Sequence, residues 1–115
     1  MRVISVNVNG LRSATNKGFF EWLEQSQADV VCLQEIRIQA HQLSLEHQPQ
    51  GWHVHFFPAQ KAGYAGTAIY SRQKPDAIEQ GLGFSLCDDE GRYIAARFGD
   101  LTVASLYLPS GSSSD

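Results

Sequence analysis

Apolar and polar residues alternate from Arg2 to Val8, and this period of two predicts a first strand. One face of that strand is apolar and is formed by Ile4, Val6 and Val8. Asn7 therefore lies on the opposite face. The Asn9-Gly10 pair that follows is a turn signal, and because no alternating partner strand comes after it, we expect a loop that carries Arg12.

A helical pattern follows the loop. Phe19, Trp22 and Leu23 recur at the spacing that places side chains on one face of a helix, and either Thr15 or Asn16 is suited to cap it. We expect all three apolar side chains to lie in the core. The residues from 2 to 34 then form a strand-helix-strand unit.

The chain is organised around the stretch D-V-V-C-L-Q-E-I-R, from Asp29 to Arg37. Its residues 30–33 are an unbroken apolar run, which is typical of a central strand covered on both faces. Gln34 and Glu35 follow directly, where the strand leaves the core, and Asn7 ends the neighbouring strand at the same edge. A carboxylate in this position suits a hard cation such as Mg²⁺. The alternative is that Glu35 pairs with a neighbouring cationic side chain.

The rest of the chain is rich in strand patterns. Residues 39–48 are polar and are expected to form a surface connection, whereas residues 61–66 form a flexible loop that carries Tyr64 between two glycines. A Gly99-Asp100 turn between two patterned segments predicts a hairpin. The predicted strands are residues 52–57, 67–71, 77–80, 93–98 and 101–108.

Two clusters of titratable residues outside this framework have ordinary interpretations. His53 and His55 share a strand face and could clamp a transition metal, but no third ligand is nearby, so solvated side chains are the expectation. The run from Asp88 to Glu90 is expected to be a solvated acidic turn.

Composition narrows the class of protein. The 115 residues carry 9 basic and 12 acidic side chains, a formal net charge of -3, which lends no support to a strong non-specific nucleic-acid binder. Cys32 and Cys87 are the only cysteines, and Cys32 lies within the apolar run, so neither a disulfide framework nor a thiolate metal site is expected. With no leader-like or membrane-spanning stretch, we expect a cytoplasmic protein of one domain that makes no use of a membrane.

Five motifs, in this order, resemble the exonuclease III type of abasic-site (AP) endonuclease, within the endonuclease/exonuclease/phosphatase superfamily. They are S-V-N-V-N-G-L-R at 5–12, V-C-L-Q-E at 31–35, G-Y-A-G at 63–66, E-G-R at 90–92 and S-L-Y-L-P-S-G at 105–111. The second half of that family has no counterpart, so the chain is similar to an N-terminal half. The resemblance implies an α/β fold, half of a four-layer α/β sandwich of two packed mixed sheets flanked by helices.

The resemblance also implies roles for individual residues. Glu35 matches the metal-binding glutamate, Asn7 the asparagine that shapes the metal and phosphate site, and Tyr107 an active-site tyrosine near the scissile phosphate. The matching DNA-binding positions are Arg12, Tyr64, Gly66 and Ser110. From the residues alone, Tyr107 is equally an ordinary strand aromatic, Tyr64 an exposed loop residue and Arg92 a structural ion-pair partner.

Several departures from the family pattern matter. Ser110 stands where the family often has an asparagine or glutamine that binds the target phosphate, and Ile36 replaces a common small polar residue. The family's D-x-N motif, a further asparagine and a closing Asp-His pair are absent, so the aspartate that activates the nucleophile and the histidine that stabilises phosphate charge have no match. We therefore expect residues 1–115 to be the N-terminal half of one domain.

The function implied is Mg²⁺-dependent hydrolysis of the phosphodiester 5′ to an abasic site in double-stranded DNA, with Mn²⁺ as a substitute and with 3′-5′ exonuclease or 3′-phosphatase activity at 3′ ends. The alternatives are a superfamily phosphatase acting on a small phosphorylated substrate and an inactive half-domain. Only one amphipathic helix is available to cover the sheet, so one sheet face is expected to remain bare. Alone, the chain is expected to aggregate or self-associate and to leave abasic DNA uncut.

Overall fold

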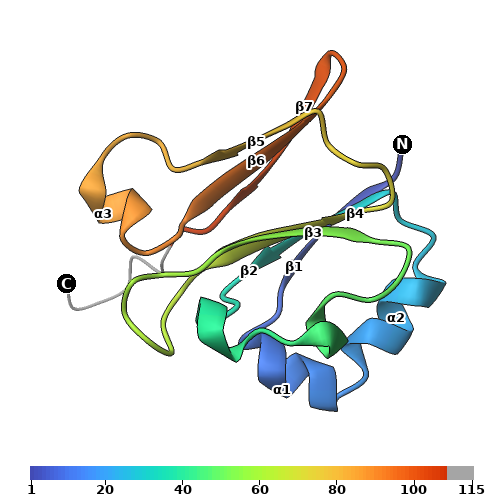
Figure 1. The fold of residues 1–115 in the computed structure, drawn as a ribbon, viewed down its shortest axis with the longest axis horizontal. Coiled ribbons are helices and arrows are strands. Elements are labelled where there is room, and N and C mark those ends of the chain that lie inside the picture. The colour runs from blue at the N-terminus through green and yellow to red at the C-terminus, as the bar shows by residue number, and fades with distance from the viewer. Residues whose placement is uncertain (109–115) are drawn as a thin grey trace.

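The computed structural model describes residues 1–108, which form two stacked sheets with helices on one side (Figure 1). The larger sheet has the order β1-β2-β4-β3, with β1 (Val3–Asn7), β2 (Val30–Gln34), β3 (His53–Phe57) and β4 (Thr67–Ser71). β1 and β2 are parallel, and the other neighbours are antiparallel. The smaller sheet has the order β5-β6-β7, with β5 (Ala77–Gln80), β6 (Tyr93–Phe98) and β7 (Leu101–Leu106).

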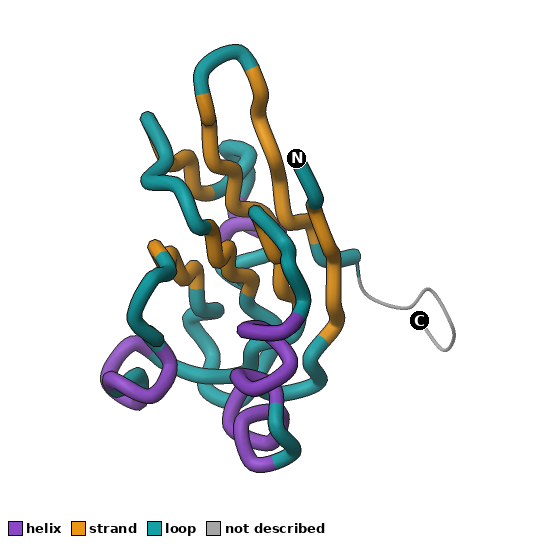
Figure 2. Tube along the Cα trace, turned by 90° about the vertical axis from the view of Figure 1, so that its right-hand side faces the viewer, coloured by secondary structure: helices purple, strands orange, loops and turns teal. Residues whose placement is uncertain are grey.

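Two α-helices and two short 3₁₀ helices cover the outer face of the larger sheet (Figure 1), and Figure 2 shows them gathered on that side of the molecule. They are α1 (Leu11–Asn16), α2 (Phe19–Gln25), η1 (Ala40–Gln42) and η2 (Leu45–His47). A third α-helix, α3 (Ser85–Asp88), lies at the end of the smaller sheet. The α/β fold that the sequence predicted is therefore present, with the strand-helix-strand unit as its first part.

β2 is buried on both faces, as its unbroken apolar run predicts. Val31 and Leu33 contribute to a core beneath α1 and α2, whereas Val30 and Cys32 contribute to a second core between the two sheets. Successive strand residues point to opposite faces, so only an all-apolar strand can supply both cores. The second core is completed by Ile69, Ile94, Ala96, Phe98 and Val103.

This second core corrects the expectation of a bare sheet face. The strands at 93–98 and 101–106 do not extend the first sheet but form their own sheet with β5, and Ile94 is 0% exposed where it packs against the first sheet. Within residues 1–108 the smaller sheet covers the inner face of β2 and β4, whereas Val3 on β1 stays 46% exposed. The sequence pattern predicted every strand to within two residues and the hairpin of β6 and β7, but it could not show that the strands divide into two sheets.

Three local expectations around the helices were also wrong. Arg12 lies in the first turn of α1, not in a loop, because the buried side chain of Leu11 fixes this short helix to the core. α2 begins after Gly18 and has no side-chain cap, while the Thr15 hydroxyl donates to the Leu11 carbonyl within α1. Trp22 is 39% exposed, so the core-facing aromatic of α2 is Phe19.

Candidate functional site

The chain turns sharply where β2 ends, and this turn builds the site. Glu35 and Arg37 both have left-handed backbone conformations, with φ of 55° and 51°. Non-glycine residues adopt that conformation at a cost of roughly 1 to 3 kcal/mol and do so mostly where function or packing requires it. Ile36 between them is fully buried, so the two charged side chains leave the turn on the open side.

Backbone hydrogen bonds from two other segments hold this turn. The Gly10 and Leu11 amides donate to the carbonyls of Glu35 and Ile36, both at 2.8 Å. On the other side, the Arg37 amide donates to the carbonyl of Ala65 at 2.8 Å. The N-G-L-R, L-Q-E and G-Y-A-G motifs thus meet at one place, which explains why they occur together in one sequence.

The Glu35 carboxylate is the centre of the cluster. Asn7 Nδ2 donates to Oε1 at 2.6 Å, and Arg37 donates to Oε2 at 2.6 Å. The hydrogen bond from Asn7 and then the guanidinium of Arg37 lower the pKa of Glu35 below its ordinary value, against the opposing effect of burial. Glu35 is therefore a carboxylate at neutral pH, and the alternative of pairing with a neighbouring cation is realised in this arrangement.

Asn7 reaches Glu35 because β1 and β2 are parallel and Asn7 lies opposite Gln34 in their register. Its amide has a defined orientation, since Oδ1 accepts the Asn9 backbone N–H at 2.9 Å and Nδ2 faces the carboxylate. The convergence of Asn7 and Glu35 expected from the strand pattern is present in the structure. In this orientation Asn7 presents a donor, not an oxygen ligand, to the centre of the site.

Gln34 is a third polar residue at this strand end, and it links the two sheets. Its Nε2 donates to the hydroxyls of Ser5 on β1 at 3.1 Å and of Ser105 on β7 at 3.0 Å. The Ser105 hydroxyl in turn donates to the carbonyl of Leu33 at 2.8 Å. The Gln of the L-Q-E motif thereby fixes the end of β7, and with it the position of Tyr107.

A hollow of about 280 Å³ opens beside Glu35 and is lined by the two tyrosines that the sequence singled out. Tyr107 follows β7, and its pKa is raised by partial burial and then by the negative charge of Glu35, so its hydroxyl carries a proton at neutral pH. Tyr64 lies in the loop before β4 and is 48% exposed. Arg37 and Glu90 also line this hollow.

A second hollow adjoins the first and has the opposite charge. It is lined by Asn9, Gly10, Arg12, Ser13, Arg37 and Gly63. Arg12 is exposed and, among the residues the structure describes, forms no ion pair. The two hollows share Arg37 and Gly63, so a continuous surface runs from an acidic side at Glu35 to a basic side at Arg12.

The other candidate residues fall outside this surface. Gly66 is buried, and a Cβ there would lie 2.7 Å from Cγ1 of Ile36, so its close neighbour is this chain and not an open surface. The close approach that Gly66 allows in the described residues is thus that of Ile36. Ser110 lies outside the described residues. Arg92 pairs with Glu90, its Nε donating at 2.8 Å, which agrees with a structural ion-pair partner.

The described residues offer few ligands for a divalent ion. Within residues 1–108 no group of three or more His, Cys, Asp or Glu side chains could hold a metal, which includes His53 and His55. Glu90, the other carboxylate at the acidic hollow, is held by Arg92. Mg²⁺ keeps several waters and is bound through one or two carboxylates, so Glu35 would be one protein ligand of a magnesium ion.

Sequence reasoning missed the importance of Arg37 and Glu90. Arg37 is the last residue of the stretch D-V-V-C-L-Q-E-I-R, and its position two residues after Glu35 was the available signal. In an extended strand such residues share a face, and here two left-handed residues give the same result. Glu90 belongs to the E-G-R motif, whose spacing allows the local ion pair.

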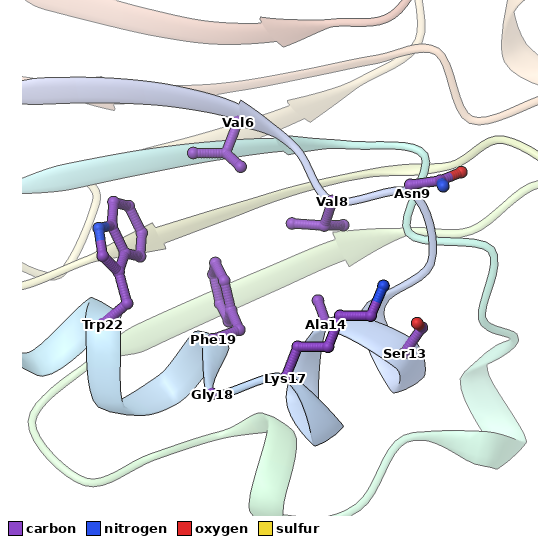
Figure 3. A pocket seen from close by; sticks show the side chains of 9 residues that line it. All are labelled: Val6, Val8, Asn9, Ser13, Ala14, Lys17, Gly18, Phe19 and Trp22. Carbon is purple, nitrogen blue, oxygen red and sulfur yellow. The ribbon is translucent and has the colours of Figure 1, made fainter.

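A further hollow, with a mainly apolar lining, lies elsewhere. It has a volume of about 270 Å³ and lies between β1 and the helices, where Val6 and Val8 face Phe19 and Trp22 (Figure 3). Its polar lining consists of single groups such as Lys17, which do not converge on one point. The polar surface at Glu35 is therefore the candidate functional site.

These features define a class: an α/β protein of two stacked sheets with a carboxylate-centred site at the strand ends. Residues 4–114 match the Endonuclease/Exonuclease/phosphatase family, so the chain belongs to that family. Its relatives include an exodeoxyribonuclease of Bacillus subtilis, 42% identical over 96% of this chain. A DNA-(apurinic or apyrimidinic site) endonuclease of Dictyostelium discoideum is 36% identical over the same share.

Solved structures give the same result. The APE2 catalytic domain of Xenopus laevis superposes with a TM-score of 0.82 at 26% identity, covering 97% of this chain and 46% of that one. An AP endonuclease from Archaeoglobus fulgidus gives 0.78 at 28% identity, covering 95% and 42%. The resemblance to AP endonucleases and the predicted fold class are thus confirmed.

The match is to part of each relative. The chain spans 43% of the Bacillus subtilis protein and 30% of the Dictyostelium discoideum protein. Among residues 1–108, every helix is too short or too polar to cross a membrane.

Proposed function

We propose that the complete protein is a DNA repair nuclease that uses Mg²⁺ to hydrolyse the phosphodiester 5′ to an abasic site. The observation that carries the proposal is a hollow that holds both Tyr107 and Glu35, whose carboxylate Asn7 binds, beside a basic surface at Arg12. Relatives named as an exodeoxyribonuclease and as AP endonucleases support DNA as the substrate. A bound Mg²⁺ on Glu35 supplies charge neutralisation at the phosphate.

The residues of this chain have the following roles in the proposal. Asn7 fixes the Glu35 carboxylate through its 2.6 Å hydrogen bond, which holds one oxygen in place and leaves the other on the side of Arg37. Tyr107 offers a protonated hydroxyl as a donor to a phosphate oxygen. Positioning of this kind supplies much of the rate enhancement in phosphoryl transfer.

DNA backbone contacts are assigned to Arg12 and Tyr64, with Ser110 as a further phosphate contact. Arg12 is exposed in the basic hollow, and Tyr64 is 48% exposed in the hollow that holds Glu35. Contacts spread over two adjoining hollows suit an extended backbone better than a small phosphorylated molecule. Gly66 is not carried into the proposal, because it is buried.

The proposal includes activity at 3′ ends, as a 3′-5′ exonuclease or a 3′-phosphatase. A Neisseria relative described as a 3′ phosphatase bound to product DNA hairpin favours this extension, with a TM-score of 0.77 at 28% identity. Mn²⁺ is the expected substitute ion. We also keep the proposal of a cytoplasmic protein, since Cys32 and Cys87 are both free and buried.

Replacing Glu35 by Gln tests the assignment. The side chain keeps its volume but loses its charge, so we expect an intact fold, weaker Mg²⁺ binding and incision of abasic duplex reduced by orders of magnitude. Glu79→Gln on the exposed edge strand β5 is the matched control and should incise at the wild-type rate. Near wild-type incision by Glu35→Gln would contradict the proposal.

The same assay distinguishes the nuclease from a small-molecule phosphatase and from an inactive half-domain. Turnover of a small phosphate ester without incision of DNA would favour a superfamily phosphatase. Residues 1–115 alone should leave abasic DNA uncut, because the described residues bring to the hollow only Glu35 and the Arg92-paired Glu90, and no histidine. Incision by that chain with Mg²⁺ would show that the missing aspartate and histidine are not needed.

A further inference from the structure

Arg37 lies at the boundary between the acidic and the basic hollow and lines both of them. Its guanidinium donates to Oε2 of Glu35 at 2.6 Å, yet 44% of its side chain is exposed. The backbone amide of Arg37 donates a hydrogen bond to the carbonyl of Ala65 in the G-Y-A-G loop. The backbone of Arg37 is thus anchored while its head group rests on one exposed ion pair, which is a weak restraint.

The charges around Arg37 change when a cation takes Glu35. Without a metal, the carboxylate and the guanidinium neutralise each other. Glu35 would hold a divalent ion with the same carboxylate that Arg37 now contacts at Oε2, while Asn7 donates to Oε1. Two positive groups then compete for one carboxylate, and Coulomb repulsion drives the guanidinium away from Glu35.

The basic hollow is the place where a displaced guanidinium can go. It lies directly beside Arg37, and Gly63, which both hollows share, has nothing within 4 Å of where a Cβ would be. Arg12 already lines that hollow, so a second guanidinium there makes a paired donor surface. Paired arginine forks suit the oxygens of a phosphate.

We propose that Arg37 is an exchangeable counter-ion: it neutralises Glu35 in the metal-free site and is transferred to a DNA phosphate when a divalent ion binds the carboxylate. The inference rests on the proposed function for its DNA half. It makes metal binding and phosphate binding mutually favourable, since each removes a competitor of the other. Arg37 is then a phosphate-binding residue only in the metal-loaded protein.

The first test measures metal binding without DNA. Mn²⁺ titrated into the complete protein, followed by calorimetry, should bind Arg37→Gln with a dissociation constant roughly tenfold lower than wild type, because a positive competitor has been removed. Arg37→Lys keeps the charge and should bind Mn²⁺ nearly as wild type does. Equal affinity of Arg37→Gln and wild type would overturn the counter-ion role.

The second test measures the salt dependence of DNA binding with Ca²⁺ and with EDTA. The probe is a closed duplex dumbbell with one abasic site, and a gel verifies that it stays uncut. Each phosphate contact contributes about 0.9 to the slope of log affinity against log salt. Arg37→Gln should therefore lower the slope by about 0.9 with Ca²⁺ and leave it unchanged in EDTA.

Two further variants test whether the change in slope comes from Arg37 and from its ion pair with Glu35. Arg97→Gln removes an arginine that is also near a carboxylate, Asp76 at 3.9 Å, but lies on β6 away from the site, so both slopes should stay at wild type. Glu35→Gln frees Arg37 from its partner and should raise the slope in EDTA. Thermal melting verifies that each variant is folded.

The outcomes separate the inference from the proposed function. A slope lowered equally with Ca²⁺ and EDTA would make Arg37 a constant contact, and no change in either would make it structural; both overturn the exchange. Absence of salt-dependent DNA binding by the wild type would overturn the proposed function and the DNA half together. The Mn²⁺ titration then still decides the counter-ion half.

Discussion

Truncation of Ile94 to alanine tests whether the two sheets of this chain form one folded unit. Ile94 is 0% exposed on β6 and packs with Val30, Cys32 and Ile69 of the larger sheet. The change removes Cγ1, Cγ2 and Cδ1, worth about 2.4 kcal/mol at roughly 0.8 kcal/mol per buried carbon. The cavity that remains adds to this, so we expect a loss of about 3 to 4 kcal/mol in the free energy of unfolding.

Urea unfolding of residues 1–115, followed by circular dichroism, measures this loss. Leu86→Ala is the matched control, since Leu86 on α3 is 65% exposed and should cost less than about 0.5 kcal/mol. Ile94→Val should cost about 1 kcal/mol. A free energy of unfolding unchanged by Ile94→Ala would refute the conclusion that the core between the two sheets stabilises the fold.

Three further changes test other parts of the structure by the same unfolding measurement. Gly91→Ala should lower the free energy of unfolding by about 3 kcal/mol or more, because φ is +58° and the added Cβ would lie 2.9 Å from the Pro58 carbonyl carbon. Gly63→Ala, whose Cβ would lie in open space, should lower it by about 1 kcal/mol. Tyr70→Phe should cost about 1 to 3 kcal/mol, since it leaves the His47 carbonyl buried without its 2.6 Å donor; a cost near zero would count against that bond. Burial lowers the pKa of His47 below its ordinary 6.5, so below that pH the unfolded chain binds a proton that the folded chain does not, and stability should fall as the pH is lowered from 7 to 5. His47→Gln should weaken this fall, whereas the exposed His41→Gln should not.

Much of the site was predictable because it depends on strand geometry. The period of two in β1 placed Asn7 on the polar face, and the apolar run of β2 placed Glu35 at its end, so two short patterns determined their convergence. Arg37 was less accessible to this reasoning. The direction of its side chain depends on the left-handed backbone conformation of Glu35 and Arg37. Hydrogen bonds from neighbouring loops impose that conformation, and the residue types do not predict it.

The errors have a common physical cause, which is tertiary contact. α1 has six residues and no side-chain cap, so nothing in its own sequence stabilises it, and the buried Leu11 keeps it folded. The pairing of β4 with β2 and β3, and of β6 with β5, is likewise decided by packing between segments that no tight turn joins. Patterns local to each strand do not contain that information.

The bridge that Gln34 makes between Ser5 and Ser105 has a consequence for the order of folding. Its two partners are separated by almost the whole described chain, so loop closure over that distance must precede the finished site. During synthesis the first strand-helix-strand unit emerges long before Ser105 does. A nascent chain therefore presents the inner face of β2 uncovered until β7 arrives, and the hollow at Glu35 is among the last parts of the molecule to form.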